Sequence, residues 1–437
     1  MSQLKKTALL LADLLTLYLA LVLTVLLRYG NEEFGGRFKA HFLPFSVIFF
    51  LWALVFYLAD LYRQSTLRNR GIFFTRLAQT MFAAVIVSIV LFYLFGAFFE
   101  LTPKTNLFIL SAVFFFLEYL WRSAMFKVLR AGNAGVIIVG DSPLVAETAR
   151  FINENPDAGY RIVLWEKNGG AVANGKLKEA VKNSGASLIV IQPKTEGAQA
   201  AVSAAYRAMS LGVNIMGFPD FYELIFEKVP LSEVDEEWFV ENIKTRRPIY
   251  ETAKELTDVV FSFVLLLVLL PISAIVGAMV ALTSRGPIIH KQKRVGRNGH
   301  VFVLYKFRSM YNNHNGPAWT EKNDERITPV GRVIRFTHLD EIPQLVNIIR
   351  GDIAFVGPRP ENTELREKYK NLPYYEIREI VRPGLSGWAQ LNYRPSASVE
   401  EAYKKLLYDI YYVKNRSFVL DVLIVLRTTK HFFLSHE

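Results

Sequence analysis

Two short segments in the last third of the chain hold charged residues of the types that phosphate chemistry uses. The segment RFTHLDEIPQL places Asp340 beside Glu341, with Arg335 five residues earlier, and the segment GPRP holds Arg359 between two prolines. A carboxylate attacks phosphorus only when it is ionised and when cations shield the approach of the two anions. Arginine is a fork-shaped donor that suits phosphate oxygens. The two segments therefore indicate a phosphate site, although adjacent carboxylates by themselves are usually helix caps.

The residues around Asp340 are typical of the first turn of a helix. Thr337 or Asp340 could cap such a helix, and Pro343 is tolerated there because its missing N–H would be unpaired. A helix N-terminus favours negative charge, so it would keep a carboxylate ionised and would also accept a phosphate. Mg²⁺ would suit a carboxylate beside a diphosphate, because it prefers oxygen ligands and keeps several waters.

An apolar segment precedes these motifs and would set their position. Residues 259–282 run for twenty-four positions without a charge, with Pro271 near the middle and lysine or arginine on both sides. Proline removes one backbone hydrogen bond and bends a helix. A full crossing would put the basic C-terminal region outside the cell, against the positive-inside rule. We therefore predict a re-entrant helix over about 257–284 that breaks at Pro271, with a proline-kinked span as the alternative.

The composition indicates a membrane part joined to a water-facing part. The chain has 437 residues, of which 51% are hydrophobic and 21% charged, and its mean hydropathy is +0.21. The absence of cysteine excludes disulfides and thiolate metal sites and favours a cytoplasmic location. The net charge of +11 suits anionic headgroups or phosphorylated substrates, although a positive-inside bias would also produce much of it.

Residues 1–130 hold four apolar runs, each near the ~20 residues that a spanning helix needs; they lie at 7–27, 41–61, 77–99 and 107–126. The first run continues to Leu27 without a cleavage site, so it is not a cleaved signal peptide. Basic residues flank the bundle so that both of its ends face the cytoplasm. Asp13, Asp60 and Glu118 lie in or at the ends of these runs. Intramembrane acids are functional candidates, but an interhelical hydrogen bond or a position near the interface is favoured because no basic residue accompanies them mid-run.

Residues 131–225 alternate short apolar strands with polar helices, which predicts a small doubly wound domain. Its first turn, VGDSPLV, matches a dinucleotide fingerprint only at Gly140, and Glu166 ends the second strand near the position that contacts ribose. NAD binding is therefore disfavoured against a structural or regulatory role. Residues 226–250 are interpreted as a linker.

Three segments in the C-terminal region carry a family resemblance. They are HKQKRVGRNGHVFVLYKFRSM at 290–310, RITPVGRVIRFTHLDEIPQLVNIIRGDIAFVGPRP at 326–360 and VRPGLSGWAQLNYR at 381–394. They resemble the bacterial sugar transferase family, the monotopic phosphoglycosyl transferases, in the large form of the polyprenyl-phosphate hexose-1-phosphate transferases. The resemblance covers roughly 246–437. The family's helix breaks at Ser-Pro, whereas this chain has Leu270-Pro271, so the proline is kept and the serine is lost.

The resemblance implies transfer of a sugar 1-phosphate from a UDP-sugar to polyprenyl (undecaprenyl) phosphate, with release of UMP. It implies that Asp340 is the nucleophile and a Mg²⁺ ligand, and that Glu341 assists. The expected setting is the cytoplasmic face of a bacterial inner membrane, at the first step of exopolysaccharide, capsule or O-antigen synthesis. A homodimer is compatible with the large form, and no nucleic-acid partner is expected. The alternative is an inactive scaffold, which would be expected to lose Asp340, Glu341 or Arg359.

The remaining predicted substrate-binding residues surround these motifs: Lys306, Arg308, Arg382, Arg394, Pro358 and Pro360. A solvated strand edge is the alternative for Lys306 and Arg308, and a structural turn is the interpretation for both prolines. Gly384 and Gly387 predict a flexible loop. Trp388 is expected to pack, and the helices after residue 400 to lie on the membrane or to cover the core.

The expected fold class is therefore membrane α with α/β. It comprises a four-helix transmembrane bundle over 1–130, a degenerate Rossmann-like domain over 131–225, and a monotopic α/β catalytic domain over 251–437 that is anchored by the re-entrant helix.

Overall fold

The computed structural model describes residues 3–59, 61, 70–94, 104–129, 133–169, 176–311, 324, 326–393 and 398–434. The chain forms two compact units, Met1–Phe221 and Tyr222–Glu437. The boundary falls inside the helix α11 (Phe218–Phe226), close to where the predicted Rossmann-like segment ends.

The four apolar runs at the start of the chain form four long helices: α1 (Gln3–Tyr29), α2 (Phe34–Leu58), α4 (Arg70–Leu94) and α6 (Lys104–Leu129). α1 packs against α2 and α6, and α4 packs against the same two helices. Large side chains such as Phe45, Trp52 and Phe114 fill the space between them. Each helix is long and apolar enough to cross a membrane, so the predicted apolar helices are confirmed.

The buried acids of these helices share an arginine. Arg122 NH2 lies 2.7 Å from Asp13 Oδ1, and Arg122 Nε lies 2.6 Å from Glu118 Oε1. The acids therefore tie α1 to α6, which is the interhelical role that the sequence favoured. The expectation that no basic residue accompanies them is wrong, because α6 continues to Leu129 and Arg122 follows Glu118 by one turn. Asp60 lies outside the described residues.

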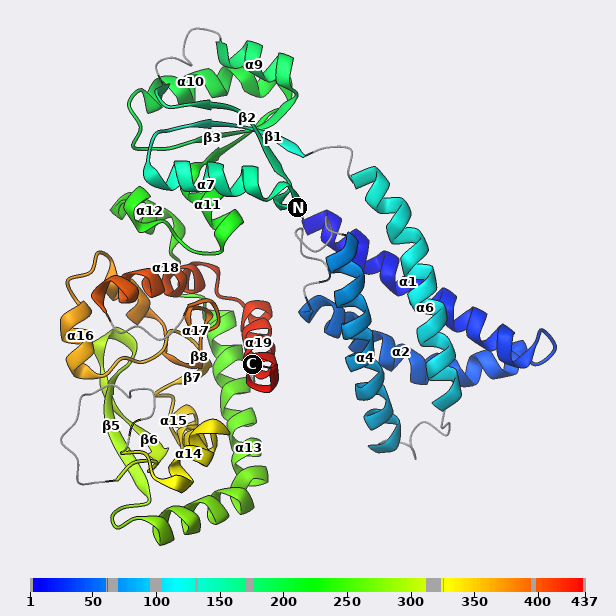
Figure 1. The fold of residues 1–437 in the computed structure, drawn as a ribbon, viewed down its shortest axis with the longest axis vertical. Helices are drawn as coiled ribbons and strands as arrows, with labels where there is room; N and C mark the ends of the chain where they lie inside the picture. The colour runs from blue at the N-terminus through cyan, green and yellow to red at the C-terminus, as the bar shows by residue number, and fades with distance from the viewer. Residues whose placement is uncertain are drawn as a thin grey trace. The chain divides into compact units, whose positions relative to one another are not determined.

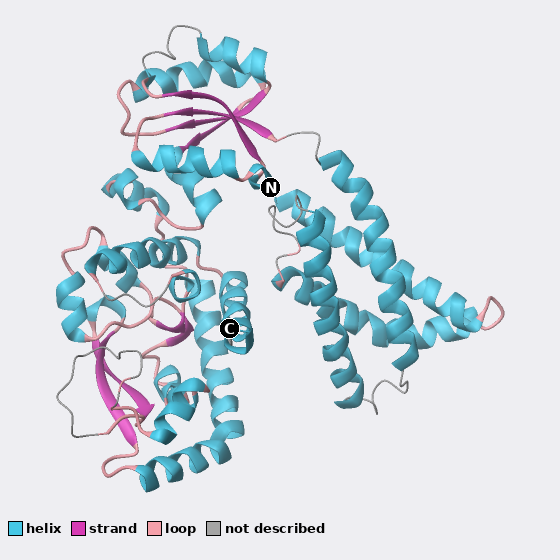
Figure 2. Ribbon diagram, viewed as in Figure 1, coloured by secondary structure: helices cyan, strands magenta, loops and turns pink. Residues whose placement is uncertain are grey.

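The four predicted strands of the Rossmann-like segment form one parallel sheet in the order β2-β1-β3-β4. They are β1 (Ala134–Val139), β2 (Tyr160–Glu166), β3 (Ala186–Ile191) and β4 (Asn214–Gly217). The helix α7 (Pro143–Glu154) covers one face, and α9 (Lys176–Ser184) and α10 (Ala198–Ala208) cover the other (Figure 2). Two short 3-10 turns, Pro156–Ala158 and Met209–Leu211, complete the unit.

The turn after β1 is closed by side chains. Gln192 Oε1 accepts a hydrogen bond from the Asp141 N–H at 3.0 Å, and Trp165 Nε1 donates to the Gly140 carbonyl at 2.8 Å. A Cβ on Gly140 would lie 2.5 Å from Gln192 Oε1. A dinucleotide pyrophosphate approaches the backbone at this turn in Rossmann folds. Gln192 takes that space here, which favours the structural or regulatory interpretation.

The predicted linker 226–250 packs into the second unit. After α11 it forms a 3-10 turn (Leu231–Glu233) and α12 (Glu236–Asn242). The Val229 N–H donates to the Leu407 carbonyl at 3.1 Å, and Phe239 and Ile243 are buried in the same core as Trp388. The segment is therefore part of the C-terminal unit rather than an exposed connection.

The apolar segment forms α13 (Pro248–Thr283), a 36-residue helix with Pro271 inside it. The ribbon changes direction in its second half (Figure 1). Val276 and Val280 are buried against the core, but most other apolar side chains of the helix are exposed, including Phe261, Leu267, Val268, Leu270, Ile275 and Leu282. An exposed apolar surface of this extent is typical of contact with lipid.

Two small sheets and several helices pack against α13. The hairpin of β5 (Ile289–Val295) and β6 (Val301–Phe307) is antiparallel, and β7 (Ala354–Val356) pairs in parallel with β8 (Gly384–Ser386). The helices are α14 (Pro329–Phe336), α15 (Gln344–Ile349), α16 (Thr363–Tyr369), α17 (Trp388–Asn392), α18 (Val399–Asn415) and α19 (Phe418–Leu434), with 3-10 turns η4 (Arg297–Gly299), η5 (Leu339–Glu341) and η6 (Tyr375–Ile380). α18 buries Leu406, Ile410 and Val413, so it covers the core, as the second interpretation of this segment expected.

Candidate active site

Asp340 and Glu341 lie on η5, in the connection between α14 and α15. The expected helix cap is wrong, because Thr337 ends α14 and its hydroxyl donates to the Val333 carbonyl at 2.9 Å. The chain then reverses through His338, which has a φ of 51°. A non-glycine residue in this left-handed region is strained, and such strain is often found at functional sites. The two carboxylates therefore lie in the first turn of a short 3-10 helix, which is entered through a strained residue and has no capping side chain.

The two neighbouring carboxylates have different environments. Lys306 Nζ on β6 lies 2.6 Å from Glu341 Oε1. Burial raises the pKa of Asp340; the Lys306 ammonium opposes this and the Glu341 charge adds to it. Burial would also raise the pKa of Glu341, but Lys306 and Arg359 outweigh it and hold that pKa below its usual value. Glu341 is thus the firmly ionised member of the pair.

Cations from three separate segments converge on this pair. The charge of Arg335, on α14, acts on Asp340, and that of Arg359, in the GPRP turn, acts on Glu341. Lys306 acts on both carboxylates. The structure therefore brings together five of the residues that the sequence singled out. Such a cluster suits an anionic ligand with several phosphate oxygens.

The GPRP turn is fixed through its backbone. Four successive carbonyls, those of residues 358–361, each accept a hydrogen bond from another segment of the chain. The donors are Gly384 N to Pro358 at 2.9 Å, Arg378 NH2 to Arg359 at 2.8 Å, Arg294 NH1 to Pro360 at 2.9 Å and Val295 N to Glu361 at 2.9 Å. Pro358 and Pro360 are buried, which fits their interpretation as structural members of the turn. Arg359 thus projects from a rigid backbone.

A buried ionic network lies behind this turn. Arg378 donates to Asp409 Oδ2 at 3.0 Å and to Tyr375 Oη at 3.0 Å, as well as to the Arg359 carbonyl. Lys405 Nζ lies 2.6 Å from Glu361 Oε1. Burial would raise the pKa of Glu361, but the Lys405 and Arg378 charges outweigh it and hold it at about 2. Every charge in this network therefore has a partner, as burial requires.

Two arginines predicted to bind substrate have other partners. Arg308 is 5% exposed and donates to the carbonyls of Ser284 and Pro287, both at 2.6 Å. It therefore fixes the end of α13, and the structure gives it a structural role. Arg382 NH2 lies 2.9 Å from Glu255 Oε1, on the first part of α13. Arg394 lies outside the described residues.

The glycines near Trp388 are present for close packing. Gly384 lies in strand β8, where a Cβ would come within 2.0 Å of the Gly357 nitrogen. A Cβ on Gly387 would meet the Gly357 carbonyl at 2.3 Å. The predicted flexible loop is therefore wrong, because these glycines allow two backbones to touch. Trp388 is 2% exposed and donates to the Glu227 carbonyl at 3.0 Å, so the prediction that it packs is confirmed.

The donor set at the pair is compatible with Mg²⁺. Asp340 and Glu341 offer carboxylate oxygens, and within the described ranges no cluster of three or more acidic, histidine or cysteine ligands occurs. Mg²⁺ is usually held by one or two carboxylates together with waters and substrate phosphates. Two carboxylates beside cations fit that pattern, with one Glu341 oxygen already bonded to Lys306.

Sequence reasoning missed several residues of the site. His338, whose charge acts on both carboxylates, was not singled out, although it stands beside them in the motif. Arg294 and Arg378 support the GPRP turn from distant segments. Arg294 could have been singled out because it belongs to the basic run HKQKR. No local sequence pattern connects Arg378 to Arg359.

The described residues form five helices that are long and apolar enough to cross a membrane. Together with an acidic pair ringed by cations, these helices define a membrane-associated protein with a site for phosphate chemistry. Residues 249–435 match the family model described as Bacterial sugar transferase. An exopolysaccharide production protein (PSS) of Rhizobium leguminosarum bv. phaseoli is 39% identical over 184 residues, which are 40% of this chain and 92% of that protein. The chain belongs to the bacterial sugar transferase family.

Longer relatives carry more specific names. The UDP-N-acetylgalactosamine-undecaprenyl-phosphate N-acetylgalactosaminephosphotransferase of Aeromonas hydrophila is 38% identical over 42% of this chain and 44% of its own length. The undecaprenyl-phosphate glucose phosphotransferase of Komagataeibacter xylinus is 29% identical over 69% of this chain and 59% of its own length. The chain thus matches about half the length of these relatives. The second match extends beyond the family region.

Proposed function

We propose that this protein transfers a sugar 1-phosphate from a UDP-sugar to undecaprenyl phosphate, forming undecaprenyl-diphosphate-sugar and UMP. The observation that carries the proposal is the Asp340–Glu341 pair with Lys306 at 2.6 Å from Glu341 and with Arg335 and Arg359 acting on the same carboxylates. The names of both relatives include undecaprenyl phosphate, and the name of the Aeromonas hydrophila relative also includes a UDP-sugar, which supports both substrates. The sugar differs among the relatives and is left open.

The reaction proceeds in two displacements in this proposal. A carboxylate oxygen of Asp340 attacks the phosphorus that carries the sugar, and the bond from that phosphorus to the bridging oxygen breaks, so that UMP leaves. A phosphate oxygen of undecaprenyl phosphate then attacks the same phosphorus, and the bond to Asp340 breaks. The carboxylate is regenerated, and no redox partner is needed.

The surrounding residues lower the cost of bringing anions together. Arg359 and Lys306 shield the phosphates, and Arg335 stabilises the ionised form of Asp340, whose pKa burial raises. Glu341 stays ionised because Lys306 and Arg359 hold its pKa low. Asp340 and Glu341 would hold Mg²⁺, which when bound supplies further neutralisation of the diphosphate charge.

Membrane attachment serves the lipid substrate. One substrate is soluble and the other has its phosphate at the headgroup level, so the site belongs at the interface. The exposed apolar face of α13 and Pro271 within it support a re-entrant helix that returns to the cytoplasmic side. The four N-terminal helices would span the inner membrane as a bundle. The product would start an exopolysaccharide, capsule or O-antigen chain.

The test uses purified full-length protein, Mg²⁺ and a panel of UDP-sugars labelled at the β-phosphate, without undecaprenyl phosphate. We expect label on the wild type and none on Asp340→Asn, and addition of undecaprenyl phosphate should release the label into lipid. UMP formed only when both substrates are present, without retained label, would mean a single displacement. Absence of any transfer with the whole panel would favour an inactive scaffold.

A further inference from the structure

A cavity lies beside the first turns of α13, and the Asp340 pair does not line it. Its volume is ≈ 690 Å³, and none of Asp340, Glu341, Lys306, Arg335 or Arg359 lines it. Its walls come from α13, the hairpin turn η4, strand β7, the segment before β8 and the corner between α18 and α19. Five of its lining side chains are cationic, namely Arg246, Lys254, Arg297, Arg382 and Arg416. Three are acidic, namely Glu251, Glu255 and Asp258. The cavity therefore carries an excess of positive charge.

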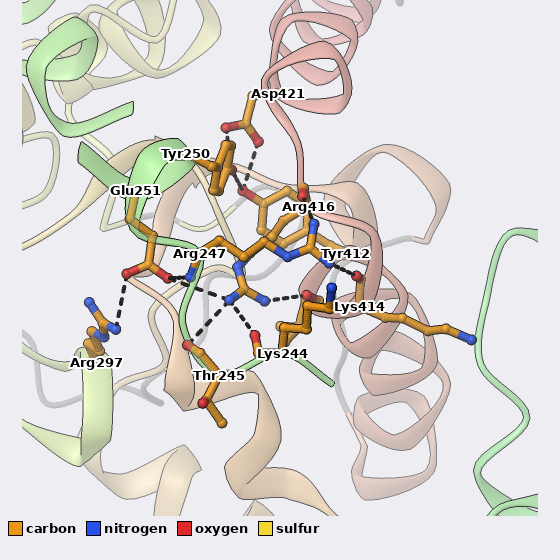
Figure 3. A network of polar contacts seen from close by, with 11 residues as sticks. Lys244, Thr245, Arg247, Tyr250, Glu251, Arg297, Tyr412, Lys414, Arg416 and Asp421 are labelled. Carbon is orange, nitrogen blue, oxygen red and sulfur yellow. Dashed lines mark hydrogen bonds and ion pairs between the residues drawn. The ribbon is translucent and has the colours of Figure 1, made fainter. Parts of the chain in front are cut away.

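The wall formed by α13 and the α18–α19 corner is rigid. Arg247 donates to the carbonyls of Lys414 and Arg416, and Arg416 donates in return to the Lys244 and Thr245 carbonyls (Figure 3). Asp421 on α19 accepts hydrogen bonds from Tyr250 at 2.7 Å and Tyr412 at 2.8 Å. Lys254 also lies 2.7 Å from Asp421. A cavity framed in this way is preformed and loses little entropy on binding.

Two of the cations, Arg382 and Arg297, pair with acids that keep contact with solvent. Arg382 lies 2.9 Å from Glu255, and Arg297 lies 3.5 Å from Glu251. The side chains of Glu255 and Glu251 are 52% and 30% exposed. Ion pairs with such solvent contact are weak, and a phosphate offers arginine a stronger bidentate partner. A phosphate can therefore displace Glu255 from Arg382 into water. Glu251 also accepts a hydrogen bond from the Arg247 N–H at 3.2 Å and lies 3.5 Å from Arg416, so a phosphate can share Arg297 with it rather than displace it.

The level of the cavity relative to the membrane indicates which phosphate compounds can reach it. Glu251, Glu255 and Asp258 line it, and the exposed apolar face of α13 begins at once with Leu256, Val260 and Phe261. In a membrane, this change from charged to apolar surface marks the headgroup level. The cavity thus lies where lipid phosphates are concentrated.

We propose that this cavity binds the phosphate group of a membrane lipid, with Arg382 and Arg297 as its two main ligands. The inference goes beyond the proposed reaction, since it requires only that α13 enters the membrane. The same chemistry is offered by an anionic phospholipid and by undecaprenyl phosphate. Arg382, which the sequence predicted to bind substrate, is assigned to the lipid phosphate.

The first experiment measures lipid binding without any turnover. Full-length protein in phosphatidylcholine nanodiscs is exposed to radiolabelled phosphatidylglycerol or, separately, to radiolabelled undecaprenyl phosphate, and label retained after re-isolation is counted. Arg382→Gln and Arg297→Gln should each weaken retention roughly tenfold, because each removes a charge-assisted bond to phosphate. Lys293→Gln removes an exposed charge outside the cavity and should leave retention unchanged.

A variant that is expected to increase lipid retention distinguishes this proposal from nonspecific electrostatic attraction between the protein and the lipid. Glu255→Gln removes the carboxylate that competes for Arg382, so retention should rise by roughly threefold or more. If the Arg382–Glu255 pair is only a structural tie, Glu255→Gln would leave retention unchanged. Equal loss of retention in Arg297→Gln and Lys293→Gln would also overturn the proposal.

The two lipid arms identify the source of the phosphate. Retention of undecaprenyl phosphate that depends on Arg297 and Arg382, with none for phosphatidylglycerol, would make the cavity part of the acceptor site. The reverse would make it a phospholipid site that sets the depth of the domain. Both results support a lipid-phosphate site. Binding is read without a sugar donor, so failure of the transfer reaction and failure of this inference are distinguishable.

Discussion

Lys306 and Glu341 form an ion pair of 2.6 Å between β6 and the turn η5, and this pair lies directly beside Asp340. The lysine thus bonds to the neighbour of the proposed nucleophile. In the described part of the chain, no ion pair joins the Asp340 carboxylate itself to a cation. Asp340 is buried, and burial raises its pKa. The arrangement keeps a cation at the site while leaving the Asp340 oxygens free for phosphorus.

The two carboxylates should respond oppositely to amide substitution. A raised folded-state pKa means that ionised Asp340 opposes folding at neutral pH, so Asp340→Asn should stabilise the protein by about 1 kcal/mol. Glu341 has a lowered pKa and a lysine partner, so Glu341→Gln should destabilise it by roughly 1–2 kcal/mol. Thermal unfolding of both variants in the same detergent measures these changes in stability. A lower melting temperature for Asp340→Asn would contradict the assignment.

The transfer rate should fall on the acid side at an unusually high pH. The ordinary pKa of aspartate is 3.8, and that of Asp340 is raised. Protonation then removes the nucleophile at a pH above 3.8, and the rate is lost as the pH falls through the shifted value. Lys306 opposes the shift, so Lys306→Met should move the acid limb of kcat/KM to still higher pH. Lys291→Met, an exposed change on β5, should not move it.

The network behind the GPRP turn should affect turnover through the position of Arg359. Arg359→Lys should lower kcat/KM by roughly 10²-fold, because lysine cannot replace a bidentate donor. Arg378 contacts the Arg359 carbonyl and its buried partners Asp409, Tyr375 and Glu361. Arg378→Lys should therefore lower kcat by roughly tenfold in protein that remains folded. Retained turnover in folded Arg378→Lys would show that the network serves stability alone.

The close approach of β7 and β8 makes Gly384 intolerant of any side chain. A Cβ there would lie 2.0 Å from the Gly357 nitrogen, so Gly384→Ala should destabilise the C-terminal unit by roughly 3 kcal/mol or more. Gly277→Ala in α13 is the matched control, because its nearest neighbours would be 3.7 Å away. Limited proteolysis of the two variants compares them, and equal resistance would refute the packing argument.

The lack of cysteine allows a direct test of the re-entrant helix. Lys244→Cys precedes α13 and Lys291→Cys follows it, and both positions are exposed. A membrane-impermeant maleimide should label both variants in inside-out vesicles and neither in intact cells. Labelling of only one of the two in inside-out vesicles would mean that α13 crosses the bilayer. Pro271→Ala, which removes the helix breaker, should shift the balance toward that crossing.

Local sequence patterns predicted the elements of the first unit. Residues 134–217 alternate with the period of buried strands and helices, and the four apolar runs match spanning helices, because both patterns depend on neighbours only a few residues apart. The Asp340–Glu341 pair and Arg359 could be singled out for the same reason, since their motifs are short and contiguous. The form of the Asp340 turn could not, because it depends on the strained His338 rather than on a capping residue.

The sequence alone determined the apolar helices, the parallel sheet and the residue types that a phosphate site needs. Only the tertiary structure decided which basic residues lie at the acidic pair and which have a structural role. Lys306 and Arg308 stand two residues apart, yet one faces Glu341 and the other is buried against the end of α13. Arg378 donates a hydrogen bond to the Arg359 carbonyl, and Gly384 allows the backbone of Gly357 to pack closely against it. Both contacts join segments that are distant in the sequence. Such contacts depend on packing in three dimensions, which local periodicity does not encode.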